Sequence, residues 1–243
     1  MLLPIAIGFF FLRQLIEFRD PFVPWTEDAE LLLTGTNWGR TWTVGLVGVL
    51  LATAGFTLAI RGKAWGWWIA TVAVVCLAAF PAFTGHANGE ESLRGLTLAA
   101  DTLHVLAATG WVGGLTLVLY SEHHWRRTSP EEPASLLPSL VPAFSPLAIA
   151  CVGTLMATGL YASIIHIDGF SALWATGYGR LLVLKLVIVF GVMSLGALNW
   201  KRLTPRLGEA AGRDALRRAA GIEMLLAHGV LLVTAMLVRT SPM

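Results

Sequence analysis

Long apolar stretches divide this sequence, and each is about as long as a helix that crosses a lipid bilayer. Such a helix needs about 20 predominantly apolar residues. Seven stretches come close to this length: Leu2–Phe18, Thr41–Ile60, Trp65–Phe83, Leu96–Tyr120, Val141–Ile165, Gly179–Trp200 and Gly221–Val238. The sequence therefore predicts an all-α fold, a polytopic transmembrane helix bundle with about seven spans.

The composition agrees with a membrane protein and gives no sign of a separate soluble domain. Hydrophobic residues make up 56% of the chain and charged residues 13%, whereas a soluble domain has about 25% charged residues. Every polar stretch is short enough to be a loop, so we expect one integral membrane domain over residues 1–243. We interpret Leu2–Phe18 as a span and not as a cleaved signal peptide, because no basic segment precedes it and no A-x-A-like site follows.

The basic residues indicate how the spans are oriented. Loops on the cytoplasmic side carry an excess of Lys and Arg, and ten of the 17 basic residues fall in alternate loops: Arg61, Lys63, Arg126, Arg127, Lys201, Arg202, Arg206, Arg213, Arg217 and Arg218. This distribution predicts a cytoplasmic N-terminus and a C-terminus on the outer side. The apolar spans imply contact with the lipid bilayer. Because the basic residues lie in short loops between spans and not on one domain face, we expect no nucleic-acid partner.

The segment 21–40, between the first two spans, mixes aromatic, apolar and acidic side chains. Trp25, Trp38 and the run Leu31–Leu33 accompany several carboxylates, a mixture that suits a segment lying along the outer membrane surface. Pro21 and Pro24 predict a break between this segment and the first span, because proline interrupts a helix.

Ionisable side chains inside the apolar stretches are the strongest functional signal. Such side chains are costly in hydrocarbon and usually face a bundle interior and carry function. Asp101 and His104 lie three residues apart, on one helical face, about 8 and 12 Å below the outer end of their span at the helical rise. Lys185 enters its span to a similar depth, about 9 Å. With His86 and His166 at the outer mouths, these residues define a polar outer half of the bundle.

Two further ionisable residues lie nearer the cytoplasmic side. His228 and Glu223 enter the last span from its inner end, so we do not expect His228 and His104 to share one coordination shell. His104 and His228 could instead be successive binding positions along one path for the ion. The ionisable residues also have purely structural interpretations. Asp101 and Lys185 could form a structural ion pair, His86 and His166 could be interfacial residues, and His228 could be a hydrogen-bonded packing residue.

Several chemistries have no support in the sequence. No Walker motif, nucleophile elbow or HExxH sequence is present, so ATP-driven transport and hydrolysis are not indicated and we expect no enzyme. Cys76 and Cys151 lie inside apolar runs without metal-type spacing and are interpreted as core residues. Gly110, Gly113 and Gly114 indicate close helix packing.

The polar residues and their spacing resemble the CopD family of bacterial copper-resistance membrane proteins. The resemblance covers nearly the whole chain, with residues 141–240 as its strongest portion. It rests on the order of these pieces: Thr36–Arg40, Gly85-His86-Ala87, Asp101 and His104, Trp111 with Gly114 and Leu115, Phe144–Ala148, Thr158-Gly159, Tyr178–Leu182 with Lys185, Asn199, and Glu223.

This resemblance implies a copper transport protein of the cytoplasmic (inner) membrane that moves copper from the periplasm toward the cytoplasm, with a periplasmic CopC-like copper carrier as partner. It implies copper-handling roles for His86, Asp101 and His104; His166 and His228 are the further metal candidates, and Lys185, Glu223 and Trp111 the supporting residues. Imidazole with carboxylate suits Cu(II), or Asp101 could instead fix the His104 tautomer. The family commonly has eight spans, so we expect either that the first span is absent here or that the sequence starts late.

A second resemblance leaves an alternative open. His104, Trp111, Gly114 and Leu115 with the later Lys185 are also similar to HemJ-type membrane oxidases, in which the matching His and Lys are associated with haem b. This implies a haem b-binding membrane oxidoreductase as the runner-up. A copper-delivery or assembly partner that transports nothing is a third possibility.

Overall fold

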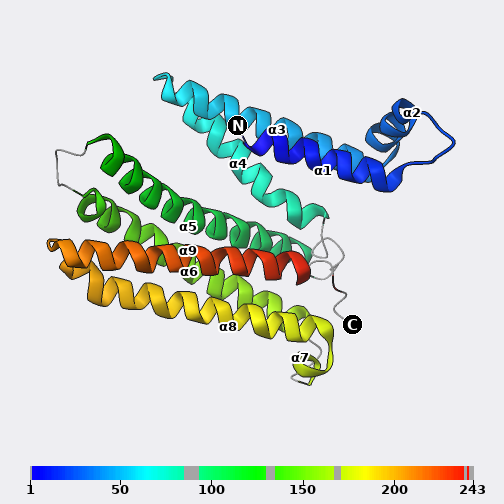
Figure 1. Ribbon diagram of the computed structural model, residues 1–243. Helices are drawn as coiled ribbons and strands as arrows, with labels where there is room; N and C mark the ends of the chain where they lie inside the picture. The colour runs from blue at the N-terminus through cyan, green and yellow to red at the C-terminus, as the bar shows by residue number, and fades with distance from the viewer. Residues whose placement is uncertain (1, 85–92, 130–134, 167–170, 238–239, 241–243) are drawn as a thin grey trace. The chain divides into compact units, whose positions relative to one another are not determined.

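The computed structural model describes residues 2–84, 93–129, 135–166, 171–237 and 240, and helices account for most of them (Figure 1). No β-strand occurs in these ranges. The chain divides into two units, Met1–Thr102 and Leu103–Met243. The predicted all-α class is confirmed.

The first unit contains four helices and the start of a fifth. They are α1 (Leu2–Phe18), α2 (Trp25–Glu30), α3 (Asn37–Ile60), α4 (Trp65–Thr84) and the first residues of α5 (Arg94–Thr128), with a π-helical turn, η1 (Leu31–Gly35), between α2 and α3. Pro21 and Pro24 lie in the non-helical connection between α1 and α2, as predicted. The segment 21–40 thus forms α2, η1 and the first turn of α3; its place on the outer membrane surface stays a prediction.

Aromatic side chains join α1 to α3. The ring centroids of Phe11 and Trp42 are 4.8 Å apart, and those of Phe10 and Trp38 are 5.7 Å apart. The indole Nε1–H of Trp42 also donates to the backbone carbonyl of Ile7 at 3.3 Å. Aromatic pairs at these separations add to the stability that their burial provides, so α1 is held against α3 by four rings and one tertiary hydrogen bond.

Helices α3 and α4 form a hairpin whose backbones approach closely. The connection turns at Gly62, whose φ of 82° is a conformation that favours glycine. A Cβ atom added at Gly66 would lie 2.5 Å from the backbone nitrogen of Ala59 and 2.6 Å from the carbonyl oxygen of Gly55. Neither backbone atom can move aside without distorting α3, so this crossing requires glycine.

Replacing Gly66 by alanine is therefore expected to lower the free energy of unfolding by about 1–3 kcal/mol, the usual cost of overpacking. Thermal unfolding of the purified protein in detergent, followed by tryptophan fluorescence, measures the change. Gly8→Ala is the matched control, because nothing lies within 4 Å of a Cβ at that position; its unfolding midpoint should not fall. Equal midpoints for the two variants would contradict the close approach of α3 and α4.

The described part of the second unit contains four long helices and one short helix. After α5 come α6 (Leu137–His166), α7 (Ala172–Ala175), α8 (Gly177–Leu198), the short turns η3 (Asn199–Leu203) and η4 (Thr204–Arg206), and α9 (Ala210–Leu237). Figure 1 shows α5, α6, α8 and α9 side by side, with the short α7 next to one end of α8. Side-chain contacts between α5 and α6, and between α5 and α9, set the register of these helices.

Five helices of the described chain are long and apolar enough to cross a membrane. They comprise Asn37–Ile60, Arg94–Thr128, Leu137–Ile165, Gly177–Arg206 and Ala210–Leu237, and Trp65–Phe80 is a shorter apolar helix. A multi-pass helical membrane protein is therefore supported. The count of about seven spans is not confirmed, because α1, with 17 residues, and the apolar part of α4 are short.

Two predicted span boundaries differ from the helices. Helix α5 continues past Tyr120 to Thr128, and α9 begins at Ala210, well before Gly221. The apolar run marks the stretch that suits hydrocarbon, but a helix can extend beyond it where its polar turns find partners. These extra turns carry Glu122 and Arg217; the pattern of basic residues predicts a loop at Arg217, and the sequence makes no prediction for Glu122.

Candidate functional site

His104 of α5 is held by a hydrogen bond to α6. Its ring nitrogen Nδ1 lies 2.8 Å from the hydroxyl Oγ1 of Thr158, and both side chains are partly buried. The same hydroxyl donates to the backbone carbonyl of Thr154, with an Oγ1–O distance of 2.7 Å. The imidazole is thus joined to a short hydrogen-bonded chain that runs along α6.

Small residues let α5 and α6 approach closely enough for this contact. A Cβ atom added at Gly159 would lie 3.8 Å from Cε1 of the His104 ring, so the ring packs beside that glycine. A Cβ at Gly110 would lie 3.3 Å from Sγ of Cys151, and one at Gly114 would overlap the Phe144 ring. The glycines singled out in the sequence at 110 and 114 therefore face α6 and bring the two helices together.

Asp101 precedes His104 by three residues on the same helix. Its side chain is half-buried, and the division between the two units falls just after it, between Thr102 and Leu103. A shared site for Asp101 and His104 therefore stays a prediction. Lys185 is half-buried on α8 and Trp111 half-buried on α5, both in the second unit.

Two of the predicted outer ligands cannot be placed. His86 lies outside the described residues. His166 is the last residue of α6, and its side chain is likewise outside the described part. Their predicted location at the outer mouths stays a prediction.

His228 belongs to a different level of the bundle from His104. On α9 it is exposed, and its Nδ1 lies 2.7 Å from the backbone carbonyl of Met224. The Thr116 hydroxyl oxygen of α5 lies 3.8 Å from the Met224 sulfur, so Thr116 and Met224 are at the same level of α5 and α9. Since Thr116 lies about 18 Å from His104 along α5 at the helical rise, the His228 region is separated from His104 along the bundle axis.

Glu223 and Asn199 form a buried polar pair between α9 and the start of η3. Each residue is 7% exposed, and the amide Nδ2 of Asn199 donates to Oε1 of Glu223. Gly196 lies beside the same carboxylate oxygen. A buried polar group costs free energy unless it is hydrogen-bonded, so this contact holds α8 and α9 in one register. The sequence named both residues through the CopD resemblance but did not predict that they touch.

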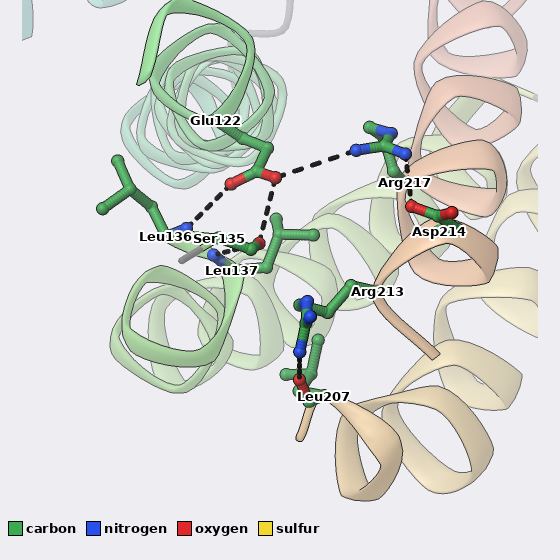
Figure 2. Close-up of polar contacts among 8 residues, drawn as sticks. All are labelled: Glu122, Ser135, Leu136, Leu137, Leu207, Arg213, Asp214 and Arg217. Atoms are coloured by element: carbon green, nitrogen blue, oxygen red, sulfur yellow. Dashed lines mark hydrogen bonds and ion pairs between the residues drawn. The ribbon is translucent and has the colours of Figure 1, made fainter. Parts of the chain in front are cut away.

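A second buried carboxylate, Glu122, joins three elements (Figure 2). It is 1% exposed. Its Oε1 accepts from the Ser135 hydroxyl at 2.9 Å, and its Oε2 accepts from the backbone N–H of Leu136 at 2.8 Å, just before α6 begins. The guanidinium of Arg217 on α9 lies 3.8 Å from Oε1 and also pairs with Asp214. Glu122 thus satisfies donors at the N-terminus of α6, where a negative charge is favoured.

An apolar cluster lies at the same end of the second unit. Val118, Leu137, Leu207 and Leu216 are all buried there, and Phe144 is among the partly buried side chains that pack against them. The guanidinium of Arg213 donates to the carbonyls of Leu207 and Gly208, and Figure 2 shows it reaching back over the turn before α9. This end of the bundle is therefore closed by apolar packing together with the Glu122 contacts.

Sequence reasoning missed Glu122 and Thr158 as contact residues. Glu122 lies past the end of the apolar run at Tyr120, where hydropathy predicts no helix. Its partner Arg217 is far away in the sequence. Thr158 appeared only as part of a family-like Thr-Gly pair. The family-like pair Thr158-Gly159 thus drew attention to Thr158, but nothing in the sequence indicated that Thr158 contacts His104.

The described residues do not by themselves form a complete metal site. Within them, no three His, Cys, Asp or Glu side chains lie together in a way that could hold a metal ion. What the described part offers is one imidazole, fixed inside a bundle of apolar helices, with further polar side chains at other levels. Support for copper therefore comes from similar proteins and not from a metal site in the described residues.

Fold and site together define a multi-pass helical membrane protein with ionisable side chains inside a helix bundle. Residues 138–237 match the CopD family, described as copper resistance protein D. The chain is also 32% identical, over 171 residues, to the copper transport protein CutJ of Bacillus subtilis (strain 168). We therefore identify the chain as a member of the CopD family, with the family segment at 138–237.

The alignment with CutJ covers 68% of this chain and 30% of that protein, so the chain spans less than a third of its relative's length. No solved structure matches the chain. The HemJ-like alternative receives no support from the family match or from CutJ.

Proposed function

We propose that this chain transports copper across the bacterial cytoplasmic membrane, from the periplasm toward the cytoplasm. The observation that carries the proposal is the match of 138–237 to the CopD family, supported by a relative named as a copper transport protein. Copper is the cargo in this proposal, and the protein is a transporter and not an enzyme. The five helices that are long and apolar enough to cross a bilayer are consistent with a transport protein.

In the proposed path, copper enters at the outer side and descends through the bundle. His86 and His166 receive the ion at the outer mouths, and His104, with Asp101 one turn before it, binds it below. A neutral imidazole with a carboxylate oxygen suits Cu(II). Lys185 offsets the Asp101 charge when the site is empty, and Trp111 is a further supporting residue. His228 and Glu223 are the candidate sites nearer the cytoplasmic side.

The proposed orientation follows from the basic residues. Lys and Arg in alternate connections, and on the polar helix ends that border them, favour a cytoplasmic N-terminus and a periplasmic C-terminus. In this orientation the start of α5, which carries His104, is on the periplasmic side, and the Glu122 end of α5 is on the cytoplasmic side. The proposed partner is a CopC-like periplasmic carrier that delivers copper to the outer mouths.

Purified protein in liposomes tests the proposal directly. Copper is supplied outside as Cu(II), or as Cu(I) under a reductant, and the metal inside is measured by mass spectrometry. We expect saturable copper uptake above that of protein-free liposomes, with no comparable uptake of Mn(II). Uptake equal to the lipid control in both redox states would overturn the transport proposal, and stoichiometric haem iron with a Soret band would replace it with the oxidoreductase alternative.

A further inference from the structure

We propose that Thr158 is the positioning residue of the His104 site: it holds the imidazole in the Nδ1–H tautomer, so that Nε2 is the nitrogen that binds copper. The copper half of this inference rests on the proposed function. The tautomer half rests only on the geometry between α5 and α6.

The position of the Thr158 hydroxyl proton decides the tautomer. Oγ1 of Thr158 lies 2.7 Å from the carbonyl oxygen of Thr154, a distance typical of an O–H···O hydrogen bond. A carbonyl has no proton to give, so the proton between these two oxygen atoms belongs to the hydroxyl. A hydroxyl has one proton, and it is therefore used toward Thr154.

The same oxygen must then accept the hydrogen bond from His104. Nδ1 lies 2.8 Å from Oγ1, and the network assigns the proton between them to the ring. A neutral imidazole carries one N–H, so the lone pair is on Nε2. Metal-binding histidines commonly donate their other N–H to a fixed acceptor, which sets both the tautomer and the ring orientation.

Packing keeps the ring in this orientation. Gly159 lies beside the imidazole: a Cβ atom added at this glycine would be 3.8 Å from Cε1 of His104, at van der Waals distance. The hydroxyl acceptor is itself fixed, because its hydrogen bond to Thr154 joins neighbouring turns of α6. The acceptor is thus a neutral hydroxyl on α6, whereas the sequence suggested the Asp101 carboxylate on α5 for this role.

A hydroxyl acceptor has a chemical consequence for the cargo. It fixes the tautomer without placing a second negative charge at the metal, as a carboxylate in the same position would. The Asp101 carboxylate is then the one negative charge at the proposed His104 site, so the ion is retained less strongly than it would be with two carboxylates there. This suits a transport site better than a permanent cofactor site.

Two substitutions separate positioning from packing. Thr158→Val keeps the shape of the side chain and removes the acceptor oxygen, whereas Thr158→Ser keeps the oxygen. Thr154→Val is the matched control, since the Thr154 hydroxyl donates to the Ala150 carbonyl at 2.9 Å and its backbone carbonyl is unaffected. The histidine tautomers are read from the ¹⁵N NMR spectrum of histidine-labelled full-length protein, with His104→Gln assigning the signal.

We expect the His104 signal to indicate Nδ1–H in the wild type, in Thr154→Val and in Thr158→Ser, and to change in Thr158→Val. His228 is an internal reference, because its Nδ1 bonds to the Met224 carbonyl and should not respond. Copper affinity, measured by competition with a chromogenic chelator, should fall about 10–100-fold in Thr158→Val and be restored in Thr158→Ser.

Each half of the proposal has its own contradicting result. An unchanged His104 tautomer in Thr158→Val would show that Thr158 does not position the ring. A changed tautomer with wild-type copper affinity would show that Nε2 is not the copper-binding nitrogen. The wild-type protein could fail to bind copper while Thr158→Val still changes the His104 tautomer. That result would contradict the copper assignment and the proposed function, and the positioning role of Thr158 would stand.

Discussion

Replacing Glu122 by alanine is expected to lower the free energy of unfolding by about 2 kcal/mol or more, because two hydrogen-bond donors at the start of α6 lose their acceptor. The carboxylate is 1% exposed and accepts hydrogen bonds from Ser135 and the Leu136 N–H. Its removal leaves those donors without their acceptor at the start of α6. Arg217, which is itself partly exposed, loses its buried partner but keeps its ion pair with Asp214. A buried donor without a partner costs about 1–3 kcal/mol by itself.

Thermal and denaturant unfolding in detergent, followed by tryptophan fluorescence, measure this loss. Glu209→Ala is the control, because Glu209 is an exposed glutamate near the start of α9 and surface substitutions usually change stability by less than about 0.5 kcal/mol. Glu122→Gln should fall between the two, since its amide oxygen accepts one donor but carries no charge. If Glu122→Ala unfolded like Glu209→Ala, Glu122 would not join α5, α6 and α9 as described.

Copper uptake into liposomes is expected to fall at least about tenfold in His104→Ala. The substitution removes the imidazole that the Thr158 hydroxyl contacts. Loss of a residue that only orients a metal ligand typically lowers metal affinity about 10–100-fold, so loss of the ligand itself should cost no less. Uptake by wild-type protein, measured under the same copper concentration and redox state, is the reference.

His123→Ala is the matched control for this experiment, because His123 is an exposed histidine farther along the same helix, α5. Its uptake should equal that of the wild type. The unfolding midpoint of each variant shows whether a change in uptake reflects loss of folding. Wild-type uptake by a folded His104→Ala protein would remove His104 from the proposed path.

The helical class of this protein could be predicted from residue type alone. An apolar run of about 20 residues has few alternatives to a spanning helix, and the helices α3 to α6, α8 and α9 lie where the runs predicted them. The number of spans was less determined, since α1 and α4 are close to the shortest length that crosses a bilayer. The helix ends were wrong where α5 and α9 continue as polar turns.

The candidate site was predictable only in part. A histidine inside an apolar run is conspicuous in any sequence, so His104 was found. Its partner was not, because Thr158 lies 54 residues away and reaches His104 only through the register of α5 against α6. Spacing along one helix made Asp101 the visible candidate for fixing the imidazole, and the packing of a second helix supplied the hydroxyl instead.

The sequence by itself determined that this is a helical membrane protein with polar side chains inside the bundle, and that it resembles the CopD family. Hydropathy is a property of each residue, and family motifs are read in chain order, so neither needs a fold. Only the tertiary structure decided that Thr158 holds His104, that Asn199 meets Glu223 and that Glu122 joins three elements. Such contacts depend on how far one helix slides along another, and that is set by the packing of small and large side chains at the crossing.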